Sequence, residues 1–328
     1  MSKITLSIVL SNYNHGHFLK DTLLALLQQS WAPDEIVLFD DASTDSSREV
    51  IAEIAARYPC VHPMLNEKNV GPVVNANLGL KMATGDYVYC AAADDRVLPG
   101  FFETSMKRAE ARDSVGIICS DPVWFYDGEQ RMWVTPMPFG RQPAYFSPAD
   151  IVQMQRVTPF NVAGHTSILN RRAALKAGGM LPELKWHCDW FMNFVVAFRH
   201  GIEYVPEPLS ALRVAAASYS ASQKRTGPEQ QKIIKALADL LAEPDYADVR
   251  QAFVDSTVLA DLGVALLEAA REDAGVAELV TQETRRRVVK TAVRKAFGNI
   301  LPNSIKAVIK NVLGQTPKDL APIAGVRV

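Results

Sequence analysis

Two pairs of adjacent carboxylates stand directly after short apolar runs of this 328-residue chain. The stretch 87–95 reads Y-V-Y-C-A-A-A-D-D, so a strand-like run ends at Asp94 and Asp95. An earlier run, I-V-L-F, ends in the same way at Asp40 and Asp41. Ligands of open α/β sheets bind at the carboxyl ends of the strands, where paired aspartates suit a divalent cation that holds phosphates. The alternative is that Asp94 and Asp95 cap the following helix or lie solvated in a turn.

The apolar pattern repeats the order strand, polar turn, helix. Strands are expected over Ile4 to Leu10, Glu35 to Phe39, Pro59 to Leu65 and from Tyr87 onward, with helical spacing between them. A further helix and strand are expected over Phe101 to Arg112 and Val115 to Ser120. Such repetition is typical of right-handed βαβ units, so we expect an α/β fold with a mostly parallel sheet flanked by helices.

The amino-acid composition limits the classes of protein to which this chain can belong. A chain that is 48% hydrophobic and 22% charged is expected to fold as one main domain with an appendage. Its four cysteines stand singly, which favours neither a zinc knuckle nor a disulfide framework and fits a reducing, cytoplasmic setting. No apolar stretch approaches the roughly 20 residues that span a bilayer, and the amino-terminal run lacks a signal-peptide cleavage site. We expect no nucleic-acid partner.

Four short motifs follow one another at defined intervals. They read S-I-V-L-S-N-Y-N, F-D-D-A-S-T-D-S-S, N-V-G-P-V-V-N-A-N-L-G-L-K-M-A-T-G-D-Y and A-A-A-D-D. Together they resemble the nucleotide-binding half of family 2 glycosyltransferases with the Rossmann-like GT-A fold, over about residues 4–215. The resemblance implies a nucleotide-sugar half over 1–98, an acceptor half over 99–220 and a helical region over 221–328. A dehydrogenase is disfavoured because no G-x-G-x-x-G follows the first strand.

The resemblance also assigns a donor site for a nucleotide-sugar. Ser11 and Tyr13 would line the uracil of a UDP-sugar, and Asp41 would accept a hydrogen bond from the imide N–H of the base. Asp95 would bind Mn²⁺ or Mg²⁺ that bridges the diphosphate, and Asp94 would accept from ribose or sugar hydroxyls. The other expected donor contacts are Asn14, Asn69, Gly71 and Asn75.

Two asparagines stand on a segment that otherwise carries Val, Leu and Met. Buried polar side chains need partners, so Asn75 and Asn77 indicate either satisfied contacts with loops or a face turned toward a ligand. The residue types leave both interpretations open.

The acceptor side and the catalytic base also come from the resemblance. The stretch G-H-T-S-I-L-N-R and the later W-H-C-D-W-F-M-N-F would contribute His165, Thr166 and Trp186 to the acceptor side and Asp189 as the base. Asp189 opens a predicted helix, so a plain N-cap is the alternative. As base, Asp189 would take the proton of an acceptor hydroxyl in a single displacement, which inverts the anomeric carbon.

Two positions depart from the family pattern. Cys188 stands where many members have an acidic neighbour of the base, and Ala215 stands where a metal-binding His often follows Arg213. The expected function is an inverting glycosyltransferase that uses a divalent cation and a UDP-sugar, in the synthesis of cell-surface polysaccharide or glycolipid. The alternative is a degenerate GT-A domain that binds a nucleotide or a partner without turnover.

The carboxyl-terminal segment is basic. Between Arg285 and Lys318 stand nine Lys or Arg and no Asp or Glu. Apolar residues recur there at helical spacing in two sets: Val289, Val293, Ala296, Phe297 and Ile300, then Ile305, Val308, Ile309, Val312 and Leu313. We expect basic amphipathic helices over 285–314 that hold the protein at the inner, anionic face of the cell membrane, near a saccharide or lipid-linked acceptor. Helices packed on the main domain are the alternative.

Overall fold

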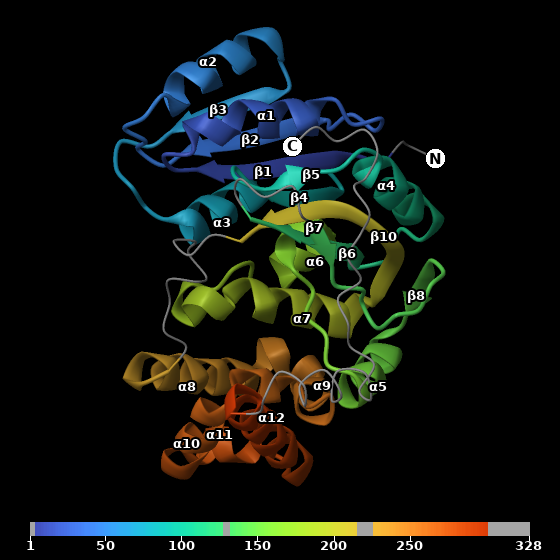
Figure 1. Ribbon diagram of the computed structural model, residues 1–328, viewed down its shortest axis with the longest axis vertical. Helices are drawn as coiled ribbons and strands as arrows, with labels where there is room; N and C mark the ends of the chain where they lie inside the picture. Colours follow the sequence, from blue (N-terminus) through green and yellow to red (C-terminus); the bar gives the residue numbers. More distant parts are fainter. Residues whose placement is uncertain (1–3, 127–131, 215–225, 301–328) are drawn as a thin grey trace.

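One sheet runs through the middle of the molecule. In this computed structural model, which describes residues 4–126, 132–214 and 226–300, ten strands of those residues take part in it (Figure 1). The strands are β1 (Leu6–Asn12), β2 (Glu35–Asp40), β3 (Val61–Leu65), β4 (Tyr87–Ala92), β5 (Arg96–Val97), β6 (Ile117–Phe125), β7 (Met132–Val134), β8 (Ala144–Phe146), β9 (Ser167–Asn170) and β10 (Ile202–Arg213). Their order is β3-β2-β1-β4-β9-β6-β10-β5, with β7 beside β6 and β8 beside β10.

Parallel pairing brings the carboxyl ends of the first strands to one edge. β1 pairs in parallel with β2 and with β4, and β2 pairs in parallel with β3. Asn12 therefore lies opposite Asp40, and Ser11 lies opposite Ala92. β6 and β10 are also parallel, whereas β9 runs antiparallel between β4 and β6. The expected α/β fold with a mostly parallel sheet is confirmed.

Helices cover both faces of the sheet because side chains alternate along each strand. One face buries Ile8, Leu38 and Tyr89 against a first set of helices. This set is α1 (Gly16–Leu27), α2 (Ser47–Arg57) and α4 (Phe101–Ala111). The other face buries Val9 and Val88 against a second set. That set is α3 (Pro72–Met82), α5 (Pro148–Val157), α6 (Arg171–Lys176) and α7 (Cys188–His200).

The carboxyl-terminal helices form a further layer beyond α7, at the end of the molecule opposite α2 (Figure 1). They are α8 (Pro228–Ala242), α9 (Ala247–Asp255), α10 (Val264–Glu272), α11 (Ala274–Glu278) and α12 (Gln282–Ile300). Their apolar residues belong to the same core as α7, since the rings of Phe191 and Phe253 stack with centroids 5.4 Å apart. The helical extension is thus confirmed, and it shares a core with the second half of the sheet. The predicted boundary near residue 220 lies outside the described residues.

The structure can be compared with the expectations for the cysteines, for membrane-spanning helices and for the carboxyl-terminal helices. The four cysteines are all free. Within the described ranges, no helix is both long enough and apolar enough to cross a membrane. The predicted helix from residue 285 is present as part of α12, while the second predicted apolar set, from Ile305 onward, lies outside the described residues.

Candidate active site

The carboxylate of Asp41 ties the loop after β3 to the end of β2. It is buried, and it accepts hydrogen bonds from the backbone N–H groups of Val70 (2.9 Å) and Gly71 (2.8 Å) and from Nδ2 of Asn66 (2.9 Å). Burial by itself would raise the pKa of Asp41, but these hydrogen bonds favour the charged form and lower the pKa. Gly71 has φ +88°, a conformation that favours glycine. Asp41 therefore shapes the loop that carries the predicted donor contacts Asn69 and Gly71.

Side-chain hydrogen bonds continue from this loop to β1. Nδ2 of Asn66 also donates to Oδ1 of Asn75 (2.9 Å), and Nδ2 of Asn75 donates to Oγ of Ser11 (3.3 Å). Asn77 makes a reciprocal pair of hydrogen bonds with the backbone of Met180, at 2.6 and 2.8 Å. Both asparagines thus make satisfied protein contacts, and a direct contact of Asn75 with a donor stays a prediction.

The turn after β1 is fastened to the turn after β2. Asn14 has the positive φ of +56°, its backbone N–H donates to Oγ of Ser43 (2.9 Å), and its Oδ1 accepts from the backbone N–H of Thr44 (2.8 Å). Beside it, the Tyr13 side chain is 47% exposed. Asn14 therefore fixes the turn, and the ring of Tyr13 lies at the surface, where an aromatic ligand can stack on it.

The acidic pair after β4 is held by the end of β10. Asp95 is 7% exposed, and its Oδ1 accepts from the backbone N–H of Arg213 (2.8 Å). Nε of Arg213 donates to the carbonyl oxygen of Asp94 (2.8 Å), and the guanidinium lies 3.7 Å from the ring centroid of Phe18. The following helix, α4, has Gly100 as its N-cap. The acidic pair therefore neither caps that helix nor lies fully solvated.

A histidine faces the same carboxylate. His165, in the short 3₁₀ segment η1 (Gly164–Thr166), places Nδ1 3.0 Å from the carbonyl oxygen of Cys90 and 3.9 Å from Oδ2 of Asp95. Burial raises the pKa of Asp95 to about 6, His165 opposes this rise, and the charge of Asp94 adds to it. The end of β4 thus concentrates negative charge at a place largely shielded from water.

The carboxylate oxygens of Asp94 and Asp95 are suitable ligands for a hard divalent cation. Buried carboxylate oxygens beside a second carboxylate are the ligands that Mg²⁺ and Mn²⁺ prefer, with phosphates and water completing the shell. Across residues 4–126, 132–214 and 226–300, no three His, Cys, Asp or Glu side chains gather as a complete metal site. Ala215, which replaces the expected His, lies outside the described residues, but Arg213 two positions earlier contacts Asp95 directly.

Asp189 lies near Cys90 of β4. It stands in the first turn of α7, half-buried, and its Oδ1 accepts from the backbone N–H of Trp190 (2.8 Å). The N-cap of α7 is His187, so the interpretation of Asp189 as a plain N-cap is wrong. Burial, followed by the charge of Asp189, raises the pKa of Cys90 to about 12. The carbonyl of Cys90 also contacts His165, so Asp189 and His165 both lie near Cys90 of β4.

The three predicted acceptor residues differ in exposure. The side chain of His165 is 39% exposed, whereas Thr166 is 2% and Trp186 is 8% exposed. Oγ1 of Thr166 donates to the carbonyl oxygen of Ala163 (3.1 Å), and Nε1 of Trp186 donates to Oε1 of Gln230 (3.0 Å). His165 is therefore the most accessible of the three, and the other two have their polar atoms engaged by the protein.

Sequence reasoning assigned no role to Asn66 or Gln230, which hold site segments in place. Asn66 directly follows the third predicted strand, a position that could have drawn attention to it. Gln230 lies in the carboxyl-terminal region, and nothing in its sequence context marks it.

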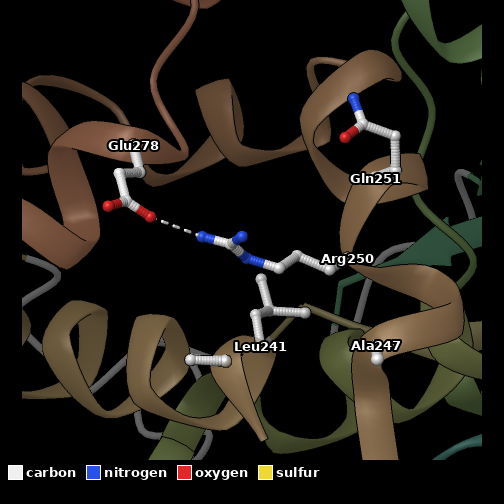
Figure 2. A pocket seen from close by; sticks show the side chains of 6 residues that line it. Leu241, Ala247, Arg250, Gln251 and Glu278 are labelled. Carbon is white, nitrogen blue, oxygen red and sulfur yellow. Dashed lines mark hydrogen bonds and ion pairs between the residues drawn. The ribbon is translucent and has the colours of Figure 1, made fainter. Parts of the chain in front are cut away.

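One surface cavity lies away from these residues. It has a volume of roughly 490 Å³ and is lined by Leu241, Ala242, Ala247, Arg250, Gln251 and Glu278. Figure 2 shows the guanidinium of Arg250 directed toward Glu278, with which it forms an ion pair at 2.9 Å. The cavity lies among α8, α9 and α11, and none of its lining residues belongs to the predicted site.

Comparison with known proteins identifies the family. The family model described as glycosyl transferase family 2 matches residues 7–178. The chain belongs to this family. The match covers β1 through α6 and therefore includes Asp41, Asp94, Asp95 and His165, while Asp189 lies beyond it.

Curated relatives of this family 2 protein carry glycosyltransferase names. An uncharacterized glycosyltransferase, YibD, of Escherichia coli is 34% identical over 128 residues, which are 39% of this chain and 37% of the relative. An uncharacterized glycosyltransferase of Nostoc is 25% identical over 228 residues, 69% of this chain and 70% of the relative. The match with the E. coli protein thus spans well under half of that relative.

Solved structures share the fold. Residues 1–349 of Staphylococcus aureus TarS, in complex with UDP-GlcNAc, give a TM-score of 0.60 at 16% identity, covering 88% of this chain and 79% of that one. A mannosyltransferase of Pyrobaculum calidifontis, in complex with GDP-Man and Mn²⁺, gives 0.51 at 17% identity, covering 89% and 87%. At these identities the likeness concerns the fold alone, and it extends into the carboxyl-terminal helices.

Proposed function

We propose that this protein is an inverting glycosyltransferase that moves a sugar from a UDP-sugar to an acceptor hydroxyl. The observations that carry the proposal are that buried Asp95 follows β4, that Asp189 lies close enough to Cys90 of β4 to raise its pKa, and that Asp41 stands at the end of β2 on the same edge of the sheet. Family membership supports the reaction class. The structural neighbours named with UDP-GlcNAc and with GDP-Man support a nucleoside-diphosphate donor.

Donor binding would use the edge formed by β1, β2 and β4. The exposed ring of Tyr13 offers a stacking surface for the base. Oδ2 of Asp41 accepts one hydrogen bond, from Gly71, so it retains a lone pair for the imide N–H of uracil. Asp95 would hold the divalent cation, and Asp94 would accept hydrogen bonds from ribose or sugar hydroxyls of the donor. A divalent cation there supplies positive charge that stabilises the diphosphate leaving group, so that no protein acid is required.

The transfer step needs one base. Asp189 takes the proton of the acceptor hydroxyl while that oxygen forms a bond to the anomeric carbon. The bond between the anomeric carbon and the phosphate oxygen breaks in the same step, and UDP leaves with the bonding electrons. A single displacement on the face opposite the leaving group inverts the anomeric configuration. The Asp189 carboxylate keeps free lone pairs for this role because the contact with Trp190 occupies one of them.

The test has two arms. A panel of nucleotide-sugars, read by thermal shift with and without Mn²⁺, identifies the donor, because a bound donor stabilises the folded state by mass action. The Asp189→Asn variant should bind that donor like the parent and transfer sugar about 10²–10⁴-fold more slowly. Equal transfer by parent and variant would contradict the assignment of the base. Tight donor binding without turnover by the parent would instead support the degenerate, nucleotide-binding alternative.

We further propose that α12 places the enzyme on an anionic membrane face, next to a saccharide or lipid-linked acceptor. The start of α12 packs on the protein, with Thr284 and Val288 each 1% exposed. Farther along, Val289 and Val293 are 51% and 47% exposed. Exposed basic residues surround them: Arg285, Arg286, Lys290, Arg294 and Lys295. An exposed apolar and basic face suits the cytoplasmic leaflet, where each basic residue adds about 1 kcal/mol.

Charge reversal tests this membrane proposal better than truncation does. Deletion of α12 would remove the buried Val288 and the hydrogen bond from Arg287 to the carbonyl oxygen of Gln155. Replacing Lys290, Arg294 and Lys295 by Glu changes exposed charge alone and should weaken co-sedimentation with phosphatidylglycerol vesicles by about 100-fold or more. A matched control reverses three exposed lysines elsewhere, Lys20, Lys107 and Lys232. Equal binding by both triple variants would contradict the role of α12.

A further inference from the structure

The segment that leads into α7 has a backbone that needs support. It is the 3₁₀ segment η2 (Pro182–His187), and Lys185 within it has φ +46° and ψ −117°. A non-glycine residue with positive φ is energetically unfavourable and persists where surrounding contacts hold it. Asp189, the proposed base, follows only two residues after the end of this segment. The geometry of η2 therefore bears directly on where the base lies.

Gln230, in the first turn of α8, contacts two residues of η2. Its Oε1 accepts from Nε1 of Trp186 at 3.0 Å, and its Nε2 lies 3.1 Å from Nε2 of His187. An indole N–H can only donate, so Trp186 fixes the orientation of the amide. Depending on its tautomer, Nε2 of His187 accepts from the NH₂ group of Gln230 or donates to Oε1, which lies 3.3 Å away. Gln230 is 1% exposed, and Trp186 and His187 are 8% and 6% exposed. Water is largely excluded here, so these polar atoms depend on one another.

The neighbouring residue of α8 holds the preceding position of η2. Glu229 forms an ion pair with Lys185 at the surface, and the hydrogen bond from Lys185 lowers the pKa of Glu229. Three consecutive residues, Lys185, Trp186 and His187, thus each contact Glu229 or Gln230. The buried hydrogen bonds of Gln230 stabilise the conformation of η2 more than the ion pair of Glu229 does, since exposed ion pairs contribute little. We call these contacts between 185–187 and 229–230 the α8 clamp.

We propose that Gln230 is a positioning residue that sets the location of Asp189 relative to the acceptor hydroxyl. The inference rests on the proposed function, in which Asp189 is the base. His187, which Gln230 contacts, is also the N-cap of α7, so a shift of His187 moves the first turn of the helix that carries Asp189. Reaction rates are sensitive to such shifts, because a displacement of about 1 Å can cost 10²-fold. The predicted donor residues lie on β1 and α3 and in the turns after β1, β2, β3 and β4, and none of the described hydrogen bonds or ion pairs joins them to the α8 clamp, although α3 packs against η2.

The test compares adjacent glutamines. Gln230→Met keeps the length of the side chain and removes both hydrogen bonds, so kcat should fall about 10–100-fold. The affinity for UDP with Mn²⁺ should stay within about twofold of the parent, since the donor site is separate. Gln231→Met is the matched control, because Gln231 makes one exposed contact, with Glu268 at 3.4 Å, and it should leave kcat unchanged. Gln230→Glu still accepts from Trp186 but cannot donate to His187, so it should recover part of the lost rate.

Hydrogen exchange tests the α8 clamp independently of sugar transfer. Hydrogen exchange of the amides of residues 183–190 should be faster in Gln230→Met than in the parent or in Gln231→Met. If the parent transfers no sugar from any donor, the proposed function fails while exchange still tests the clamp. Unchanged exchange overturns the clamp itself. A kcat within twofold of the parent, or a loss of UDP affinity as large as the loss of kcat, overturns the positioning role. If Gln230→Met does not fold, Trp186→Phe removes the indole N–H that donates to Gln230. Faster exchange of residues 183–190, a lower kcat and an unchanged UDP affinity would then support the proposal, and unchanged exchange or an unchanged kcat would overturn it.

Discussion

Replacing Asp41 by Asn should destabilise the loop after β3 and weaken donor binding together. The Asp41 carboxylate accepts from Val70, Gly71 and Asn66, and hydrogen bonds to a charged group contribute about 1.5–3 kcal/mol each. An Asn side chain keeps one accepting oxygen, which preserves weaker bonds to Val70 and Asn66, but turns an NH₂ group toward the N–H of Gly71. We therefore expect the free energy of unfolding to fall by about 2–4 kcal/mol, which for a chain of this length corresponds to a melting temperature lower by roughly 3–6 °C.

The effect should depend on pH with a defined sign. The folded-state pKa of Asp41 is lower than in the unfolded chain, so its contribution to stability is present above the unfolded value near 3.9 and is lost as the pH falls through the folded value. The difference in stability between parent and Asp41→Asn should therefore be constant from about pH 5 to pH 8 and shrink below about pH 4.

Two measurements and one control decide the outcome. Thermal unfolding reports the loss of stability, and calorimetric titration with UDP should show a dissociation constant raised at least about tenfold, because the loop carries predicted donor contacts. Asp239→Asn is the control, since Asp239 is an exposed carboxylate of α8 that pairs only with Lys235 among the described contacts. If Asp41→Asn melts and binds UDP as Asp239→Asn does, the assignment of Asp41 as the organiser of this loop is refuted.

Three further substitutions test other parts of the site. Asp95→Asn should abolish the Mn²⁺-dependent part of UDP binding measured by calorimetry, and an unchanged metal dependence would exclude Asp95 as a ligand. Asn77→Ala removes a reciprocal pair of hydrogen bonds and should lower the free energy of unfolding in urea by about 1–3 kcal/mol; unaltered stability would contradict the importance of that pair. Arg213→Lys loses the bond to the carbonyl of Asp94 and the stacked guanidinium, so it should be less stable in urea than the surface control Arg172→Lys by about 1 kcal/mol. Equal stability of the two variants would count against a structural role for Arg213.

Local signals explain what the sequence predicts well. An apolar run followed by adjacent aspartates is contained within ten residues, and β2 and β4 do end beside Asp41 and Asp94. The first turn of α7 at Asp189 follows from the same kind of pattern, because its apolar residues recur at helical spacing. These features needed no knowledge of distant parts of the chain.

Distant partners explain what the sequence does not predict. The Asp41 carboxylate accepts from backbone N–H groups 29 and 30 residues away. Every residue except proline has such a group, so no residue type marks the partners. Gln230 reaches Trp186 across 44 residues. In α12, a helical stripe alone does not say which side faces the protein, and the structure buries Val288 while it exposes Val289.

The two cores on either side of the sheet have a consequence for synthesis on the ribosome. The helices that cover one face, α1, α2 and α4, are complete when residue 111 has been made. On the opposite face, α3 covers Val9 once residue 82 has been made, whereas the part formed by β6 is covered by α7 and the helices behind it, up to Leu266 in α10. At about 5–20 residues per second, roughly 10–30 s separate the two events. In that interval the first face still lacks Ile168, Val205 and Leu209, and the part of the opposite face that α7 covers stays apolar and uncovered. A chaperone that binds apolar surface would meet this chain on the α7 side of the sheet.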